Sequence, residues 1–208
     1  MVVALQVRSS RRKGLIVNGV IIYLIGFAGC GKLTIAKAIQ ARYDCILIDN
    51  HRINNVIFSL LDLDGQTKLP ENVWENVGLV RSAVLDTIRR MAKPARNFVF
   101  TNELLERDPL SEKVFLDIAE LARERKAWFL PVRLSISPEE LSRRVVSTGR
   151  AEQFKETNAQ AALEKAQEQE VFKPHGSTYL EIDVTTRAPE EVAVTIIAAL
   201  PKAELHLE

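Results

Sequence analysis

Apolar runs alternate with segments of helical periodicity from residue 20 onward. Within the runs, polar and apolar residues do not alternate, which indicates strands that are buried on both faces of a parallel sheet. The runs are "VIIYLIGF", "CILIDN", "NFVFTN", "AWFLPVRLS" and "YLEIDV". The pattern therefore predicts five strands, over 20–27, 45–50, 97–102, 127–135 and 179–184.

Helical segments follow each of these strands. They are predicted over 33–43, 51–63, 74–91, 110–126, from 138 onward, and 189–200. The helix at 138 has a clear start, because Ser137 is a good N-cap and Pro138 suits the first helical position. Strands that alternate with helices in this way predict an α/β fold of three layers, a five-stranded parallel sheet with helices on both faces.

Length and charge set the domain organisation. The chain has 208 residues, 47% of them hydrophobic, and a net charge of +1. This length suits one domain with a substantial core, and the near-neutral charge gives no overall field that favours nucleic acid or an anionic membrane. We expect an N-terminal extension over 1–18, one domain over 19–202, and a tail over 203–208 to which we give no functional weight.

The cysteine content and the hydropathy of the sequence indicate in which cellular compartment the protein works. The two cysteines, Cys30 and Cys45, are too few for a disulfide scaffold and have no metal-ligand spacing. No apolar run reaches the ~20 residues that span a bilayer. We expect a cytoplasmic protein with no membrane partner.

The sequence "GFAGCGK" begins at the end of the first predicted strand and opens a helix. It has the GxxxxGK spacing of a phosphate-binding loop, in which backbone N–H groups surround phosphate oxygens and the helix start adds its positive dipole end. Lys32 is predicted to neutralise the β and γ phosphates of ATP. The other predicted contacts from this loop are Gly26, Ala28, Gly29, Cys30 and Gly31.

Leu33 is a departure from this motif, because a Ser or Thr normally stands there and gives an oxygen to Mg²⁺. Thr34 is the nearest hydroxyl, but a step of about 100° along the helix is expected to turn it toward the sheet. Leu33 and Thr34 are both counted among the nucleotide contacts. We expect Mg²⁺ to bind more weakly, held by phosphates, waters and a carboxylate.

Four stretches together resemble the nucleoside-monophosphate-kinase-like group of P-loop small-molecule kinases, with most similarity to shikimate and gluconate kinases. They are "GFAGCGK", "ILIDNHRI", "LSRRVVSTGR" and "LEIDVTTRAPEEVA". The resemblance implies the P-loop NTPase fold, ATP and Mg²⁺ as cofactors, and a small lid at about 147–160. It also implies phosphoryl transfer to the hydroxyl or phosphate of a small-molecule acceptor.

The resemblance also implies roles at the ends of the second and third strands. Asp49 matches an acid near the metal, which it would contact through water. His51 stands where a second acid would bind the acceptor, so either Asp49 or His51 is a candidate to accept its proton. Arg52, Thr101 and Asn102 are further candidate acceptor contacts. The alternatives are a helix N-cap for Asp49, a surface histidine for His51, and ordinary turn chemistry for Thr101 and Asn102.

The last two stretches imply a lid and a base-binding loop. Arg144 and Arg150 match the lid arginines that reach the transferring phosphoryl group, and Arg144 would also contact the nucleotide. The alternative for each is a solvated arginine paired with an acid. By likeness alone, the loop that packs on adenine contains Thr186, Arg187 and Pro189.

Acceptor identity stays open at this level. Arg52, Arg81 and Arg89 are available for an acceptor carboxylate, and Trp74 fits a core position better than a pocket wall. A different class of function is a nucleotide-binding switch or interaction module with weak or no kinase activity, which Leu33 and His51 motivate. Nucleic-acid processing is disfavoured by the neutral charge.

Overall fold

A computed structural model describes residues 19–61, 69–146, 158–176 and 178–201. The five strands are β1 Val20–Ile25, β2 Ile46–Asp49, β3 Phe98–Asn102, β4 Trp128–Ser135 and β5 Leu180–Asp183. They form one sheet in the order β2-β3-β1-β4-β5, and every pairing is parallel. The predicted five-stranded parallel sheet is confirmed. The predicted extension, the tail, Arg150 and most of the predicted lid lie outside the described residues.

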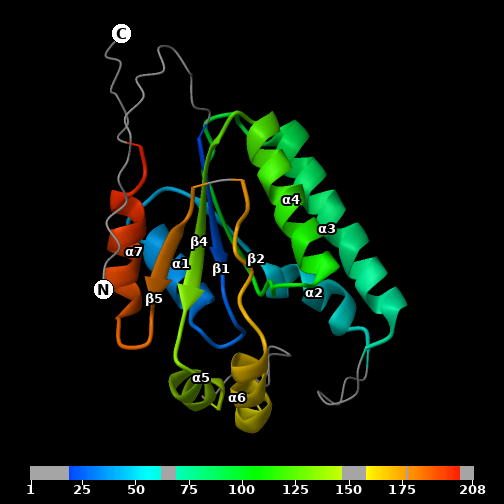
Figure 1. Cartoon of the computed structure of the whole chain (residues 1–208). Helices are drawn as coiled ribbons and strands as arrows, with labels where there is room; N and C mark the ends of the chain where they lie inside the picture. The colour runs from blue at the N-terminus through cyan, green and yellow to red at the C-terminus, as the bar shows by residue number, and fades with distance from the viewer. Residues whose placement is uncertain (1–18, 62–68, 147–157, 177, 202–208) are drawn as a thin grey trace.

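Helices cover both faces of the sheet (Figure 1). They are α1 Lys32–Gln40, α2 Asn50–Phe58, α3 Glu71–Met91, α4 Pro109–Glu124, α5 Pro138–Val145, α6 Ala159–Glu168 and α7 Pro189–Ala198. The pair α1 and α7 lies on one face and the pair α3 and α4 on the other, while α5 and α6 lie beyond the carboxyl ends of the strands (Figure 1).

Helix α6 is an element that the sequence pattern did not predict, because most residues of the surrounding stretch, 147–170, are polar. The Asn158 side chain caps it, accepting hydrogen bonds from the backbone N–H groups of Gln160 and Ala161. Only Ala162 in this helix is fully buried. Ala159 and Ala166 pack beside it against the main core, so the helix has both a capping residue and a narrow face of small apolar residues.

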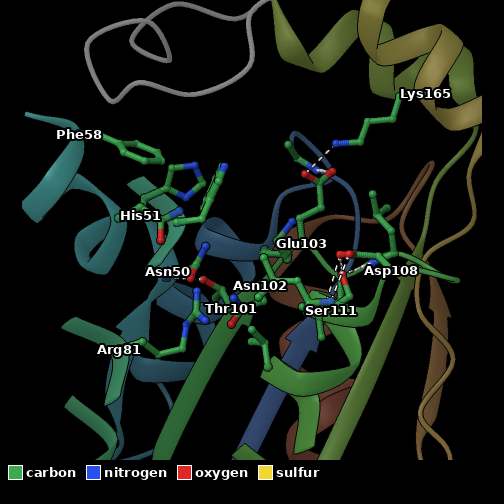
Figure 2. A pocket seen from close by; sticks show the side chains of 18 residues that line it. Asn50, His51, Phe58, Arg81, Thr101, Asn102, Glu103, Asp108, Ser111 and Lys165 are labelled. Carbon is green, nitrogen blue, oxygen red and sulfur yellow. Dashed lines mark hydrogen bonds and ion pairs between the residues drawn. The ribbon is translucent and has the colours of Figure 1, made fainter. Parts of the chain in front are cut away.

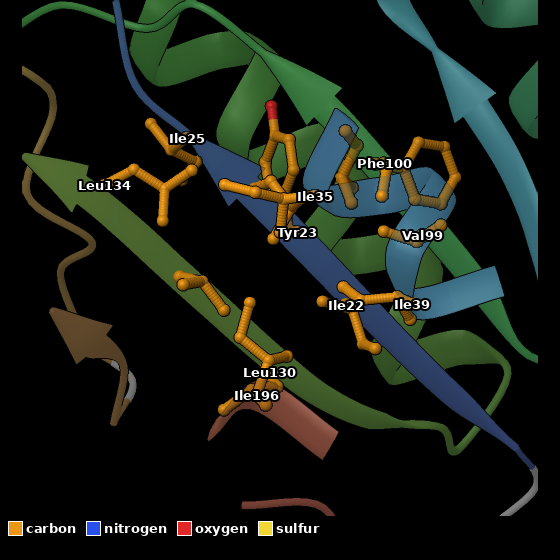
Figure 3. Close-up of a cluster of buried hydrophobic side chains, with 14 of the residues drawn as sticks. Ile22, Tyr23, Ile25, Ile35, Ile39, Val99, Phe100, Leu130, Leu134 and Ile196 are labelled. Atoms are coloured by element: carbon orange, nitrogen blue, oxygen red, sulfur yellow. The ribbon is translucent and has the colours of Figure 1, made fainter. Parts of the chain in front are cut away.

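The core is centred on β1, all six residues of which are buried. Tyr23 stacks on Phe115, and Ile35 and Ile39 of α1 pack in the same cluster (Figure 3). A central strand with apolar neighbours on both faces has little freedom to move. The end of β1, and the loop that follows it, are thus held in a fixed position relative to the ends of β2 and β3.

Candidate active site

The loop between β1 and α1 has the backbone form of a phosphate cradle. Gly31 caps α1 with a φ of 101°, a left-handed conformation that side-chain-bearing residues rarely adopt. Gly26 is required for a different reason: a Cβ there would lie 2.8 Å from the Cys30 sulfur and 3.2 Å from the Leu134 Cβ. The spacing of glycines in "GFAGCGK" is therefore dictated by the loop geometry.

Lys32 begins α1 and folds back over the cradle. Its Nζ atom donates hydrogen bonds to the carbonyl oxygens of Gly26 and Phe27, each at 2.7 Å. The side chain is half-buried and lines the cavity described below. Its ammonium group therefore lies at the mouth of the loop, where phosphates would bind.

Leu33 is partly buried and packs against the main core, whereas Thr34 is exposed. The expectation that Thr34 faces the sheet was wrong. The buried face of α1 is set by Ile35, Ala36, Ala38 and Ile39, and Thr34 lies on the opposite side of the helix. Because leucine occupies the position next to Lys32, the first turn of α1 offers no inward-facing hydroxyl to a metal ion.

Glu103 was not among the predicted site residues, yet it lies directly against the cradle. It follows β3, which pairs with β1, and its Oε1 accepts a hydrogen bond from the backbone N–H of Ala28 at 2.9 Å. Its Oε2 accepts one from Lys165 of α6 at 2.9 Å (Figure 2). An acid one residue past the end of a strand was the only sequence signal for it, and Lys165 had none.

Glu103 is ionised despite its environment. Burial raises the pKa of its carboxyl. The charges of Lys165 and Lys32 and the hydrogen bonds from Lys165 and Ala28 together lower the pKa by more than burial raises it, so the pKa is below the ordinary 4.5. A negative charge is therefore present beside Lys32 throughout the neutral pH range.

Asp49 ends β2 beneath the site. It stands at the N-cap position of α2 but makes no capping hydrogen bond, and its Oδ1 instead accepts one from the Thr101 hydroxyl at 2.7 Å. The His51 Nδ1 lies 3.9 Å from the same oxygen, an ion-pair distance that is too long for a hydrogen bond. Asp49 is 6% exposed and does not line the cavity, whereas His51 and Thr101 do.

A cavity of about 360 Å³, here called the inner cavity, extends from the cradle across the ends of β2 and β3 (Figure 2). Its lining combines apolar side chains with polar and charged ones. The polar and charged lining residues are Lys32, Asn50, His51, Asn54, Arg81, Thr101, Asn102, Glu103, Asp108, Ser111 and Lys165. Asp108 is occupied as the N-cap of α4, where it accepts hydrogen bonds from the backbone of Leu110 and Ser111.

Three of the predicted acceptor contacts meet in this cavity, whereas Asp49 and Arg52 do not line it. His51, Thr101 and Asn102 all line it, but Arg52 is exposed and lies outside it. Of the other two arginines, Arg81 lines the cavity, while Arg89 pairs with Glu124 on the outer side of α3. Trp74 is 39% exposed and lines the cavity, so the preference for a core position was wrong.

Arg144 of α5 joins the cradle to the loop after β5. Its guanidinium donates hydrogen bonds to the carbonyl oxygens of Cys30, Val184 and Thr185 at 3.2, 2.9 and 3.1 Å. Glu140 accepts a hydrogen bond from the Nε of Arg144. The hydrogen bonds from Arg143 and Arg144 lower the pKa of Glu140 to about 2. Arg144 does not line the inner cavity, and its contacts with Cys30, Val184 and Thr185 lie on the predicted nucleotide side.

The predicted base-binding loop is ordered by its own contacts. Asp183 accepts hydrogen bonds from the backbone N–H and the hydroxyl of Thr185. Arg187 folds back to the Thr195 hydroxyl at 2.7 Å, and Pro189 is the first residue of α7. Thr186 is exposed. The loop therefore has a defined shape beside Arg144.

The described residues lack two kinds of feature. They contain no cluster of three or more His, Cys, Asp or Glu side chains arranged to hold a metal ion. Among the helices that the structure describes, none has the length and apolar character to span a membrane.

The parallel sheet and the glycine-rich cradle define a P-loop nucleotide-binding fold, and solved structures with the same fold include small-molecule kinases. A protein from Chloroflexus aurantiacus aligns with a TM-score of 0.63 and 14% identity, over 88% of this chain and 96% of its own. A thymidylate kinase from Candida albicans aligns with a TM-score of 0.56 and 14% identity, over 87% of this chain and 90% of its own. A gluconokinase from Sinorhizobium meliloti aligns with a TM-score of 0.53 and 17% identity, over 87% of this chain and 90% of its own.

Identities this low establish a shared fold alone. No protein-family model matches the sequence, and neither does any curated protein. The chain thus has the fold of P-loop small-molecule kinases, as the four sequence stretches predicted. The finer likeness to shikimate or gluconate kinases stays a prediction.

Proposed function

We propose that the protein transfers a phosphoryl group from ATP to a hydroxyl or phosphate of a small molecule. One observation carries this proposal: the inner cavity begins at Lys32 and Ala28 of the cradle and continues along polar side chains at the ends of β2 and β3. A nucleotide held in the cradle would direct its terminal phosphate into a cavity that suits a small acceptor.

The nucleotide would be held by the cradle and by Arg144. The backbone N–H groups of the loop bind phosphate oxygens, and Lys32 exchanges its carbonyl partners for the phosphates, which neutralises their charge. Arg144 fixes the distance between the cradle and the Thr185 loop, where the base would lie. Arg150 remains a predicted lid residue.

Mg²⁺ fits this site through one carboxylate. Leu33 gives it no oxygen, and Asp49 is buried and does not line the cavity, whereas the ionised Glu103 lines the cavity beside Lys32. Mg²⁺ often keeps several waters and takes one or two carboxylates together with phosphates, so such a donor set is sufficient. We assign the metal contact to Glu103 in place of Asp49. The metal would neutralise charge on the transferring group.

The acceptor would lie against His51, Thr101 and Asn102. His51 is positioned to accept a proton from an acceptor hydroxyl, and the Asp49 carboxylate 3.9 Å behind it stabilises the charged imidazole that results. Thr101 connects the two strands by donating to Asp49 and accepting from the backbone N–H of Asn50 at 3.4 Å. The groups proposed to accept the proton are thus positioned by the ends of two paired strands, β2 and β3.

A nucleotide-binding switch with weak or no kinase activity is the second candidate, and Leu33 is the observation that favours it. The two functions separate in one experiment, a screen for ADP release with a panel of hydroxylated metabolites, nucleosides and nucleotides, with and without Mg²⁺. Acceptor-stimulated, Mg²⁺-dependent ADP release supports the kinase. Tight ATP binding with no stimulation by any acceptor and no Mg²⁺ dependence contradicts it and supports the switch.

Replacing Leu33 by serine is expected to lower the Mg²⁺ concentration that half-saturates ATP binding by about tenfold, because it restores a hydroxyl ligand for a hard cation. Leu33 also packs on the core, so a loss of about 2 kcal/mol in unfolding free energy is expected. Leu33→Ala is the matched control, since it loses the same packing without gaining an oxygen. Identical Mg²⁺ titrations for the two variants would show that the metal does not contact position 33.

A further inference from the structure

Lys165 places a second ammonium group beside the cradle. Its Nζ lies 2.9 Å from the Oε2 of Glu103, and both side chains are partly buried and line the inner cavity together with Lys32. Figure 2 shows Lys165 reaching Glu103 from α6. The charges of both lysines act on this one carboxylate.

The backbone around this ion pair is held by pairing between two segments that are distant in sequence. Leu105, which closely follows Glu103, forms an antiparallel bridge with Val171, which closely follows α6. Backbone hydrogen bonds of 2.9 and 3.0 Å flank this bridge, and Arg133 of β4 donates to the Val171 carbonyl at 3.1 Å. The backbone therefore brings Lys165 to Glu103, so the pair does not depend on two freely moving side chains.

Both oxygens of Glu103 are engaged by protein groups. Oε1 accepts a hydrogen bond from the Ala28 N–H, and Oε2 accepts one from Lys165. A cation bound to Oε2 would meet the lysine ammonium at the same oxygen, and two positive charges at one carboxylate repel each other. Lys165 and a metal ion are therefore alternative partners of Glu103.

Leu33 takes a metal-binding oxygen away from the cradle and thereby gives this lysine a role. Leucine packs against the core where a hydroxyl ligand normally stands. No cluster of three or more acids, histidines or cysteines able to hold a metal occurs within the described ranges. Without a cation beside it, the Glu103 carboxylate would repel the phosphates of a nucleotide in the cradle. Lys165 supplies that cation from the chain itself.

We propose that Lys165 is a positioning residue that neutralises Glu103 in the absence of metal and leaves it when a metal ion is bound there. The protein then binds ATP without metal, because the ion pair presents no net negative charge to the phosphates. It binds metal less tightly than Glu103 alone would allow. This inference rests on the proposed function, because it concerns the positive charge of the same nucleotide site.

Lys165→Met tests the proposal, because methionine keeps much of the apolar stem and removes the charge. Two affinities are measured at about pH 8, where carboxyl groups are ordinarily ionised. Calorimetry gives the affinity for ATP in the presence of EDTA. Paramagnetic resonance gives the affinity of the ATP-bound protein for Mn²⁺, with the protein in excess over ATP so that the nucleotide is bound.

The affinity for metal-free ATP is expected to fall by about tenfold in Lys165→Met, because the Glu103 charge is no longer neutralised. The affinity for Mn²⁺ is expected to rise by about tenfold, because no ammonium group has to leave the carboxylate. General loosening of the site would lower both affinities, so the opposite signs identify an exchange between lysine and metal.

Three further variants serve as controls. Lys165→Arg keeps the cation and is expected to leave both affinities close to those of wild type. Lys173→Met removes the same charge from an exposed residue outside the inner cavity, and neither affinity is expected to change. In a Glu103→Gln background, Lys165→Met is expected to give no rise in Mn²⁺ affinity, because there is no carboxylate to release.

The results separate this inference from the function on which it rests. A fall in both affinities, no change in either, or equal effects in Lys173→Met overturns this inference alone. So does a wild-type protein that binds ATP only when metal is present. The proposed function itself fails if the wild-type protein binds no ATP with or without metal, or if no acceptor stimulates ADP release.

Discussion

Replacing Lys32 by alanine is expected to lower kcat/KM for ATP by about a thousandfold, the scale seen when one preorganised group that stabilises the transition state is removed. Lys32 gives the cradle its positive charge, because its Nζ donates hydrogen bonds to the carbonyl oxygens of Gly26 and Phe27. Without it, the β and γ phosphates lose a charge-assisted hydrogen bond, and the developing charge loses its nearest compensation.

The measurement is ATP affinity by calorimetry together with steady-state ADP release. Lys37→Ala is the control, since Lys37 is exposed on the same helix and lies outside the inner cavity. Thermal unfolding checks that the fold survives, with a loss of about 1 kcal/mol expected from the two missing hydrogen bonds. Full ATP affinity in Lys32→Ala would remove the basis for a phosphate cradle at this loop.

The second large effect is expected from Glu103→Gln. This change keeps the shape of the side chain and an oxygen that accepts from the Ala28 N–H, but it removes the charge. If Glu103 holds Mg²⁺, the affinity of the ATP-bound protein for the metal should fall by about 100-fold, and kcat should fall by a similar factor. Paramagnetic resonance of Mn²⁺ in the presence of ATP measures the first effect without relying on activity.

Glu106→Gln is the matched control, because Glu106 lies in the same loop, contacts the Lys173 backbone and does not line the cavity. The pKa of Glu103 is below 4.5, so its carboxyl stays charged as pH falls through the neutral range, and its contribution to metal affinity should be constant there. If Glu103→Gln binds Mn²⁺ as tightly as the wild-type protein, a group other than Glu103 holds the metal.

The cradle was predictable because its determinants are local. Gly26, Gly31 and Lys32 lie within seven consecutive residues, and their spacing follows from the turn between a buried strand and a helix. The central strands β1 and β3 were predictable for a related reason, since their apolar runs without alternation require burial on both faces. Helix α6 escaped detection because its regularly spaced apolar residues, at 159, 162, 163 and 166, are mostly alanines within a polar stretch and give only a weak pattern.

Thr34 shows where local reasoning about the site fails. The rotation of one residue along a helix is known, but the direction of the core is set by Ile35, Ile39 and the strands against which they pack. Sequence alone identified the missing hydroxyl at Leu33, whereas it did not determine which way the neighbouring residue faces.

By itself, the sequence determined the parallel sheet, the phosphate cradle and the unusual leucine within it, because each depends on residues that are adjacent or regularly spaced. The tertiary structure alone decided that Glu103, Lys165 and Arg81 share one cavity. These residues come from a loop after β3, a helix after the predicted lid and the middle of α3, and each has an unremarkable sequence context. The packing of the sheet and its helices, which no short pattern encodes, brings their charges together.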